Sequence, residues 1–322
     1  MKYKRFIISS LVTALTLFLL MEIIFLSNKY IGTNNLELIT FVKRDWIRSN
    51  ISESSSNKKL VIALGDSKIA SSFLPDVFDK ELNYKTFSLN LAMVTHDVTR
   101  NFYVLQDFLK LNRKPDYILM YISYERPLLN SLNENWEERL YYYKKNKNNI
   151  FIKDYFFPAI NKNKVNNAFI NLAKLISLNK ERNESVNHML NDKGAYFWLG
   201  KYTSIGEKKN FSDLNIDPDK NIHEIKKNYL YEIEKFLKFT TENKIKVIII
   251  FPPLVENTIT INNLPKEYIE MKKKYPLLEI SKMTKAEYSS ELFMTRGHTN
   301  YIGAKEYSKD LANSIDSQLR IK

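Results

Sequence analysis

The residues Leu60-Val-Ile-Ala-Leu64, followed at once by Gly65-Asp66-Ser67, constrain the fold of this chain more than any other stretch. An apolar run of this length that ends in a turn signal is typical of a buried strand. Strands of this kind belong to parallel sheets that helices cover on both faces. Open α/β sheets bind ligands at the carboxyl ends of their strands, so Ser67 is expected where a ligand binds. The alternative is a tight turn with a capping serine.

The remainder of the chain supplies further strands and helices in alternation, which predicts parallel βαβ units. Between about residues 124 and 221 this pattern stops, and we interpret that part as a largely helical insertion. Its aromatic stretch at 192–200 either lines a groove for sugar rings or packs the insertion onto the core, and we favour packing. The expected strands are 84–91, 117–122, 246–251 and 277–280, and the expected helices are 68–73, 76–81, 95–112, 222–243, 265–274 and 301–319.

The N-terminal residues predict a membrane anchor. Lys2, Lys4 and Arg5 precede a mainly apolar run from Phe6 to Leu26, which is about the length of a transmembrane helix. Basic residues before the run predict a cytoplasmic N-terminus and an extracytoplasmic domain, so we expect a single-pass protein of the cytoplasmic membrane. A cleaved signal peptide is the alternative, but the residues around Ser27 form a poor cleavage site.

We therefore divide the chain into three parts. Residues 1–28 form a cytoplasmic stub and the anchor, and residues 59–322 form the α/β domain with its insertion. Residues 29–58 form a linker, in which we expect a short helix at 36–46 and a polar, serine-rich stretch from 48.

Composition excludes several classes of function. The chain has no cysteine, which rules out disulfides, thiolate metal sites and cysteine nucleophiles. The net charge of +13 suits an anionic polymer, but no nucleic-acid-binding module is present. No glycine-rich phosphate loop follows a strand, which disfavours a nucleotide-binding module. His96-Asp97 lacks further ligands at metal-binding spacing, so we expect neither a metal nor another cofactor.

A second polar stretch lies near the end of the chain, where His298 precedes the last expected helix. Thr299 or Asn300 can cap this helix, and Gly303-Ala304 permits its close packing on the sheet. If the sheet brings His298 to Ser67, the imidazole can take the serine proton and return it to a leaving group, as nucleophilic acyl transfer requires.

Gly65-Asp66-Ser67 near the start of the domain, together with His298-Thr-Asn-Tyr-Ile-Gly-Ala near its end, resembles the SGNH (GDSL-type) hydrolase superfamily. The resemblance covers about residues 59–122 and 246–319. It implies a three-layer, flavodoxin-like parallel sheet, with Ser67 as nucleophile, supported by Asp66, and His298 as base. With its anchor and insertion, the chain is more similar to envelope members that act with membrane-bound O-acyltransferases in polysaccharide acylation or lipoteichoic acid D-alanylation.

The chain departs from the family pattern at three places. An acidic residue usually lies three positions before the histidine, where this chain has Thr295, and Glu291 could substitute only if the loop folds back. The stretch Asn90-Leu91-Ala92 replaces the usual oxyanion glycine, which leaves the Ala92 N–H and the Asn90 side chain as candidate donors beside the Ser67 N–H. The stretch Tyr121–Glu125 lacks the usual Gly-x-Asn.

Two functions follow from this pattern. The first is an anchored, extracytoplasmic serine esterase or acyltransferase acting on acyl groups of a cell-envelope polysaccharide. Its partners would be the glycan or acyl donor and a membrane-bound O-acyltransferase. The second is a scaffold that keeps the fold without the chemistry and binds a glycan or an acyltransferase. A short distance between Ser67 and His298 would favour the enzyme.

Overall fold

The computed structural model describes residues 3, 12–13, 16, 43, 46–49, 51, 57–94, 96–122, 187–196, 227–256, 266–283, 286–295 and 297–319. The chain divides into two compact units, residues 1–39 with 142–182 and residues 40–141 with 183–322. Every helix and strand named below belongs to the second unit. Of the expected anchor, only residues 12, 13 and 16 are described. Within the described ranges, no helix is both long and apolar enough to cross a membrane.

A five-stranded sheet forms the centre of the domain, with the strand order β2-β1-β3-β4-β6. Every neighbouring pair is parallel, and Ile62 of the first strand lies between Leu89 and Ile118. This order is that of flavodoxin-like sheets, so the predicted parallel α/β fold is confirmed. The strands are β1 (Lys59–Leu64), β2 (Thr86–Asn90), β3 (Tyr117–Met120), β4 (Lys246–Ile249) and β6 (Leu278–Ile280).

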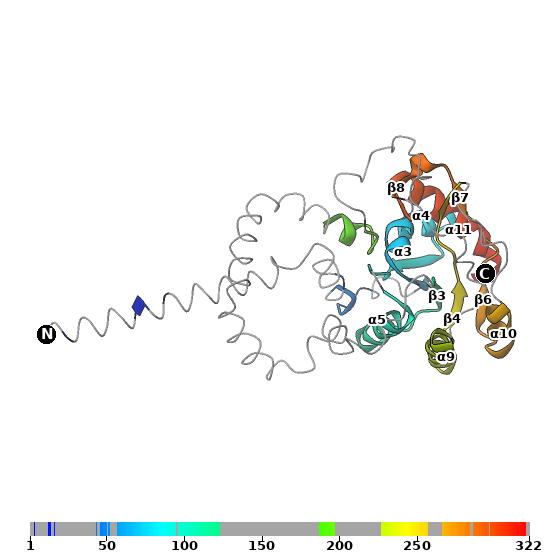
Figure 1. The fold of residues 1–322 in the computed structure, drawn as a ribbon, viewed down its shortest axis with the longest axis horizontal. Coiled ribbons are helices and arrows are strands. Elements are labelled where there is room, and N and C mark those ends of the chain that lie inside the picture. The colour runs from blue at the N-terminus through cyan, green and yellow to red at the C-terminus, as the bar shows by residue number, and fades with distance from the viewer. Residues whose placement is uncertain are drawn as a thin grey trace. The chain divides into compact units, whose positions relative to one another are not determined.

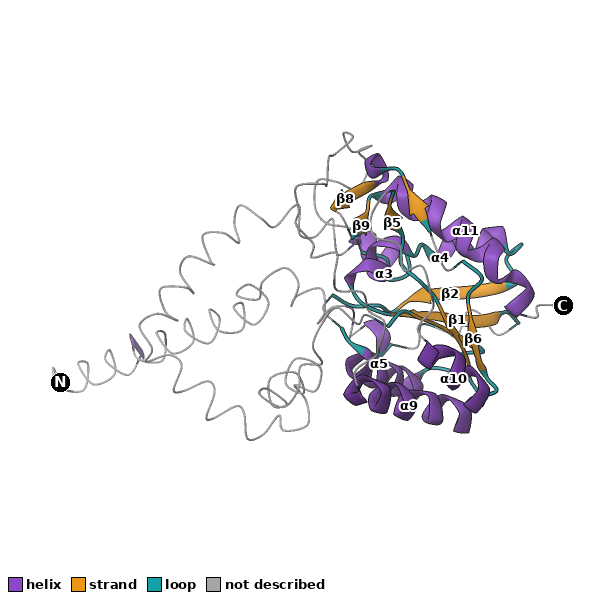
Figure 2. Cartoon of the chain, turned by 45° about the vertical axis from the view of Figure 1, so that its right-hand side comes forward, coloured by secondary structure: helices purple, strands orange, loops and turns teal. Residues whose placement is uncertain are grey.

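Helices cover both faces of this sheet, which gives three layers (Figures 1 and 2). Val61 and Leu119 of the sheet pack with Leu311 and Ile315 in one buried cluster. This burial explains why the sheet strands are almost wholly apolar. The layer that includes the last helix consists of α3 (Ser67–Ser72), α4 (Pro75–Glu81) and α11 (Tyr301–Leu319), and the opposite layer of α5 (Val98–Leu111), α9 (Lys227–Glu242) and α10 (Lys266–Lys274).

Short strands lie beyond the carboxyl ends of the sheet strands. Most of them belong to the stretch of chain just before α11. β5 (Leu254–Val255) pairs in parallel with β7 (Glu287–Tyr288). After the 3₁₀ helix η3 (Ser290–Leu292), β8 (Phe293–Thr295) pairs antiparallel with β9 (His298–Thr299). The sequence predicted a loop at His298, whereas the structure holds this residue in a two-stranded hairpin. Strands this short have too few residues for an alternating pattern to be recognised.

The start of α11 follows the sequence prediction in part. Asn300 is the N-cap, because its Oδ1 accepts a hydrogen bond from the Gly303 N–H, whereas Thr299 is committed elsewhere. A Cβ on Gly303 would lie 2.3 Å from the carbonyl oxygen of Leu292. Gly303 therefore permits close packing as expected, but against η3 rather than against the sheet.

The part of the insertion that the structure describes packs on the rest of the domain. The Asn90 N–H donates to the Lys193 carbonyl, and the Tyr196 N–H donates to the Ala70 carbonyl of α3. Tyr196 is buried, and burial raises its pKa to about 12. For residues 192–196 these contacts support the packing interpretation of the aromatic stretch, while 197–200 and most of the insertion lie outside the described residues.

Part of the predicted linker is corrected by the structure. Lys43 and Ile47 are buried, and Arg48 forms an ion pair with Asp107 of α5. At these residues the predicted linker is therefore packed on the domain instead of connecting it loosely to the anchor. Its polar composition concealed the contacts, because lysine and arginine can be buried when their polar groups find partners.

Candidate active site

The turn between β1 and α3 presents Ser67 at the carboxyl edge of the sheet. Asp66 is the N-cap of α3, and its Oδ1 accepts a hydrogen bond of 2.8 Å from the Lys68 N–H. Asp66 is thus a supporting residue that determines where the helix begins. A Cβ on Gly65 would lie 3.0 Å from the Ile69 side chain and 3.2 Å from that of Tyr121, so a larger residue would push this turn away from α3 and β3.

The hairpin β8–β9 brings His298 to this turn. The Nε2 atom of His298 lies 2.9 Å from the Oγ atom of Ser67. Thr299 holds the hairpin against α3, because its Oγ1 donates to the carbonyl of Ser71 over 2.9 Å. Asn300 also donates from Nδ2 to the carbonyl of Glu291, which closes the loop on itself. The two residues that the sequence paired are therefore within hydrogen-bond distance.

Thr295 occupies the other side of the imidazole. Its Oγ1 lies 2.7 Å from Nδ1 of His298. If Nε2 accepts the Ser67 proton, Nδ1 carries a hydrogen and donates it to the threonine oxygen. A neutral hydroxyl can thus hold the ring and its tautomer where SGNH enzymes use a carboxylate, although it adds no negative charge to stabilise an imidazolium.

Glu291 lies in η3 with its side chain exposed, and its hydrogen bond to Asn300 uses the backbone carbonyl. The structure thus gives no support to Glu291 as a substitute for the missing acid. The hairpin explains this, because Thr295 pairs directly with His298 across β8 and β9.

Asn90 does not face a substrate, which corrects its assignment as an oxyanion donor. It is fully buried at the end of β2. Its Nδ2 donates to the carbonyls of Ile69, Ala70 and Phe73 over 3.0, 3.2 and 2.8 Å. Ile69 and Ala70 lie in the second half of α3 and Phe73 is its C-cap, so one amide binds the carboxyl end of this helix. Asn90 is therefore a structural clamp between the sheet and α3, the helix that begins at Ser67.

The backbone N–H of Ala92 is also committed, because it donates to Oδ1 of Asn90 over 3.2 Å. The prediction of the Ala92 N–H as an oxyanion donor is therefore corrected too, because this group already donates within the protein. The Ser67 N–H remains, since the first N–H groups of a helix lie before its first intrahelical hydrogen bond. The stretch at 123–125, where the family pattern places an asparagine, lies outside the described residues.

Two contacts at the site were not predicted from the sequence. Asn101 of α5 accepts a hydrogen bond of 3.2 Å from the Gly65 N–H and so supports the turn that precedes Ser67. Lys68 packs its side chain 3.3 Å from the Cβ position of Gly297, and its Nζ lies 5.9 Å from the ring centre of Tyr121. Asn101 interrupts an otherwise apolar helix face, and a buried polar residue of this kind is the signal that could have identified it.

His96 and Asp97 directly precede α5. Asp97 caps α5 by accepting from the Arg100 N–H, and burial, with smaller contributions from Arg100 and Lys43, lowers the pKa of His96 well below its ordinary value. Among the residues that the structure describes, no three histidine, aspartate or glutamate side chains come together as a metal site would require.

Comparison with known proteins adds little to this geometry. No protein-family model and no curated protein matches the sequence. A crystal structure from Bacteroides fragilis, described as that of a "putative acylhydrolase", aligns over 87% of this chain and 96% of its own, with 10% identity and a TM-score of 0.35. A likeness this weak carries no argument for fold or function, so both rest on this chain's own sheet order and side-chain geometry.

Proposed function

We propose that this protein is an SGNH-type serine esterase or acyltransferase. The observation that carries the proposal is the 2.9 Å distance between Ser67 Oγ and His298 Nε2 at the carboxyl edge of a parallel sheet. A nucleophile and a base within hydrogen-bond distance, with the base oriented by a third group, form the arrangement used for covalent acyl transfer.

The reaction would proceed in two steps. Ser67 Oγ attacks the ester carbonyl carbon while its proton passes to Nε2 of His298, and the Ser67 N–H stabilises the oxyanion. His298 returns the proton to the departing alcohol, which leaves an acyl group on Ser67. Water or an acceptor hydroxyl then gives its proton to His298 and attacks the acyl carbon, and His298 returns the proton to Ser67 Oγ as the bond to the acyl group breaks. Water yields hydrolysis, and an acceptor hydroxyl yields transfer.

For the substrate we propose an acylated or acylatable cell-envelope polysaccharide. The net charge of +13 would attract an anionic glycan. The apolar run at 6–26 supports attachment to the cytoplasmic membrane with the domain outside, near a membrane-bound O-acyltransferase. Comparing O-acyl content of the envelope glycan in cells with the wild-type protein and with Ser67→Ala tests this part, and equal content would contradict it.

A serine-reactive fluorophosphonate tests the chemistry itself. We expect the full-length protein to form one adduct at Ser67, located by peptide mass spectrometry, and we expect Ser67→Ala to form none. Ser71→Ala is the matched control, because Ser71 lies one turn further along α3 and its hydroxyl bonds to carbonyls of that helix. Folded wild-type protein that forms no adduct would contradict the enzyme and favour a scaffold that binds a glycan or an acyltransferase.

Variants of Thr295 test how the imidazole is held. Thr295→Val removes the 2.7 Å contact to Nδ1 while keeping the side-chain shape, and we expect kcat to fall about 5-fold, the equivalent of one hydrogen bond. Thr295→Asp adds a charge that stabilises the imidazolium, and we expect kcat to rise about 10-fold. Initial rates on a chromogenic acetyl ester measure both, and a Thr295→Val enzyme as fast as wild type would show that this contact is dispensable.

A further inference from the structure

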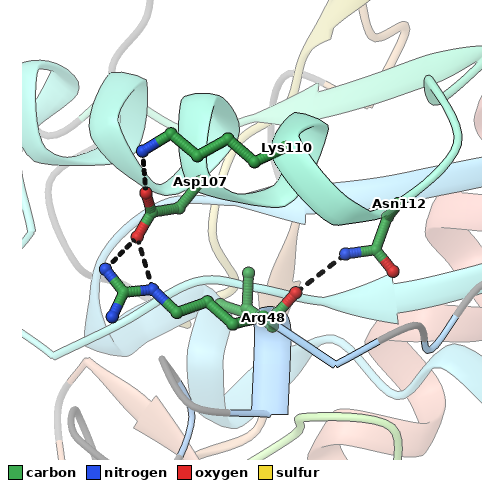
Figure 3. Close-up of polar contacts among 5 residues, drawn as sticks. Arg48, Asp107, Lys110 and Asn112 are labelled. Carbon is green, nitrogen blue, oxygen red and sulfur yellow. Dashed lines mark hydrogen bonds and ion pairs between the residues drawn. The ribbon is translucent and has the colours of Figure 1, made fainter.

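A short segment before the domain is docked on α5. We call Lys43, Trp46–Ser49 and Ile51 the docked segment. Arg48 donates from Nε and Nη2 to one oxygen of Asp107, over 2.9 and 2.6 Å, and Lys110 pairs with the other oxygen (Figure 3). The Asp107 carboxylate is almost fully buried, so these charge-assisted bonds are worth more than a surface ion pair.

Asn112 binds the docked segment a second time, at the end of α5. Its Nδ2 donates to the Ile47 carbonyl over 2.8 Å, as Figure 3 shows, and its Oδ1 accepts from the Ile51 N–H over 3.0 Å. The Ile47 side chain is fully buried. Side-chain burial, an ion pair and backbone hydrogen bonds therefore hold this segment to the domain.

Lys43 anchors the other end of the docked segment inside the domain. Only 1% of the residue is exposed, and its Nζ donates to the carbonyl oxygens of Ala92 and Gly194. Lysine is almost never buried to this degree unless its amine is satisfied, and burial lowers its pKa well below the ordinary value. One amine thus joins three parts of the chain: the docked segment, the loop after β2 and the described part of the insertion around Gly194.

The loop that Lys43 holds is bonded to the nucleophile turn. The Met93 N–H donates to the Gly65 carbonyl over 3.2 Å, and the Leu91 N–H donates to the Ala63 carbonyl over 2.9 Å. Gly65 lies two residues before Ser67. A shift of Ala92 therefore acts on the backbone that positions the serine.

We propose that Lys43 is a positioning residue for Ser67, and that the site is correctly formed only while the docked segment holds the loop after β2. This inference rests on the proposed function. The residues that precede the docked segment include the expected membrane anchor. The Lys43 contacts would therefore make the activity of Ser67 depend on the docking of the segment that links the anchor to the domain.

Two full-length variants separate this role from simple stability. Lys43→Met keeps the length and burial of the side chain but removes both hydrogen bonds to carbonyls. We expect fluorophosphonate labelling of Ser67 to slow about 10- to 100-fold, because small displacements near a nucleophile have effects of this size. We expect kcat to fall with little change in KM, and amide hydrogen exchange at residues 91–94 to increase.

Arg48→Gln is the matched control, because it loosens the same segment at the end that is remote from the loop. We expect faster exchange at residues 46–51 and a labelling rate within about 2-fold of wild type. Equal labelling rates for Lys43→Met and wild type would overturn the inference, as would an equal loss in both variants. If wild-type Ser67 forms no adduct, the proposed function fails separately, and unchanged exchange at residues 91–94 in Lys43→Met would then refute the positioning role.

Discussion

Replacing Ser67 with alanine is expected to lower kcat for ester hydrolysis by about 10³-fold or more, because the acyl-enzyme can no longer form. His298→Ala is expected to lower kcat to a similar degree, since Nε2, which lies 2.9 Å from Oγ, is the base in the proposed mechanism. Initial rates on a chromogenic acetyl ester, with circular dichroism to confirm folding, measure both effects.

The double variant Ser67→Ala/His298→Ala distinguishes a catalytic pair from two independent residues. Groups that act as one unit are non-additive, so we expect the double variant to be about as slow as either single variant. Ser71→Ala is expected to keep the wild-type rate within about 2-fold, since its hydroxyl bonds only within α3. Wild-type activity in Ser67→Ala would refute the proposed nucleophile.

Asn90→Leu is expected to lower the free energy of unfolding by about 3 kcal/mol, because it leaves several buried polar groups without their amide partner. The Asn90 side chain donates to two carbonyls of α3 and to that of its C-cap Phe73, and it accepts from the Ala92 N–H. Leucine has a similar volume, so the loss reflects hydrogen bonding more than packing. Urea denaturation should show a lower midpoint with an unchanged slope.

The matched control is Asn313→Leu on the outer face of α11, where an exposed asparagine bonds to Glu81. We expect this variant to change the free energy of unfolding by less than about 0.5 kcal/mol. If Asn90→Leu kept wild-type stability but lost activity, Asn90 would be a catalytic donor and its role as a clamp would be wrong.

The arrangement of the sheet was predictable from the sequence because its signals are local. Leu60–Leu64 and Lys246–Phe251 are apolar runs of strand length, and such runs need burial on both faces wherever they lie. A parallel sheet collects the carboxyl ends of its strands at one edge. For this reason the pairing of a serine after the first strand with a histidine before the last helix could be predicted from the sequence alone.

The roles of Thr295, Asn90 and Ala92 depended on tertiary contacts. The sequence located Thr295 three residues before His298, but only the β8–β9 hairpin brings its hydroxyl to Nδ1. Asn90 could have donated to a ligand or to the protein, because its side-chain NH₂ group donates equally well to either acceptor. The tertiary contacts decide between them, since the Asn90 Nδ2 donates to the carbonyls of Ile69, Ala70 and Phe73.

Lys43 was the least predictable residue, because hydropathy assigns a lysine to solvent and its segment to a linker. Its burial depends on carbonyls of Ala92 and Gly194, which are far from it in the sequence and carry no sequence-specific signal. The sequence by itself therefore determined which segments form the strands of the sheet and that Ser67 pairs with His298, since periodicity and motifs are local properties. Only the tertiary structure decided which polar groups serve the site and which hold it in place, because each such choice depends on a partner brought near by folding.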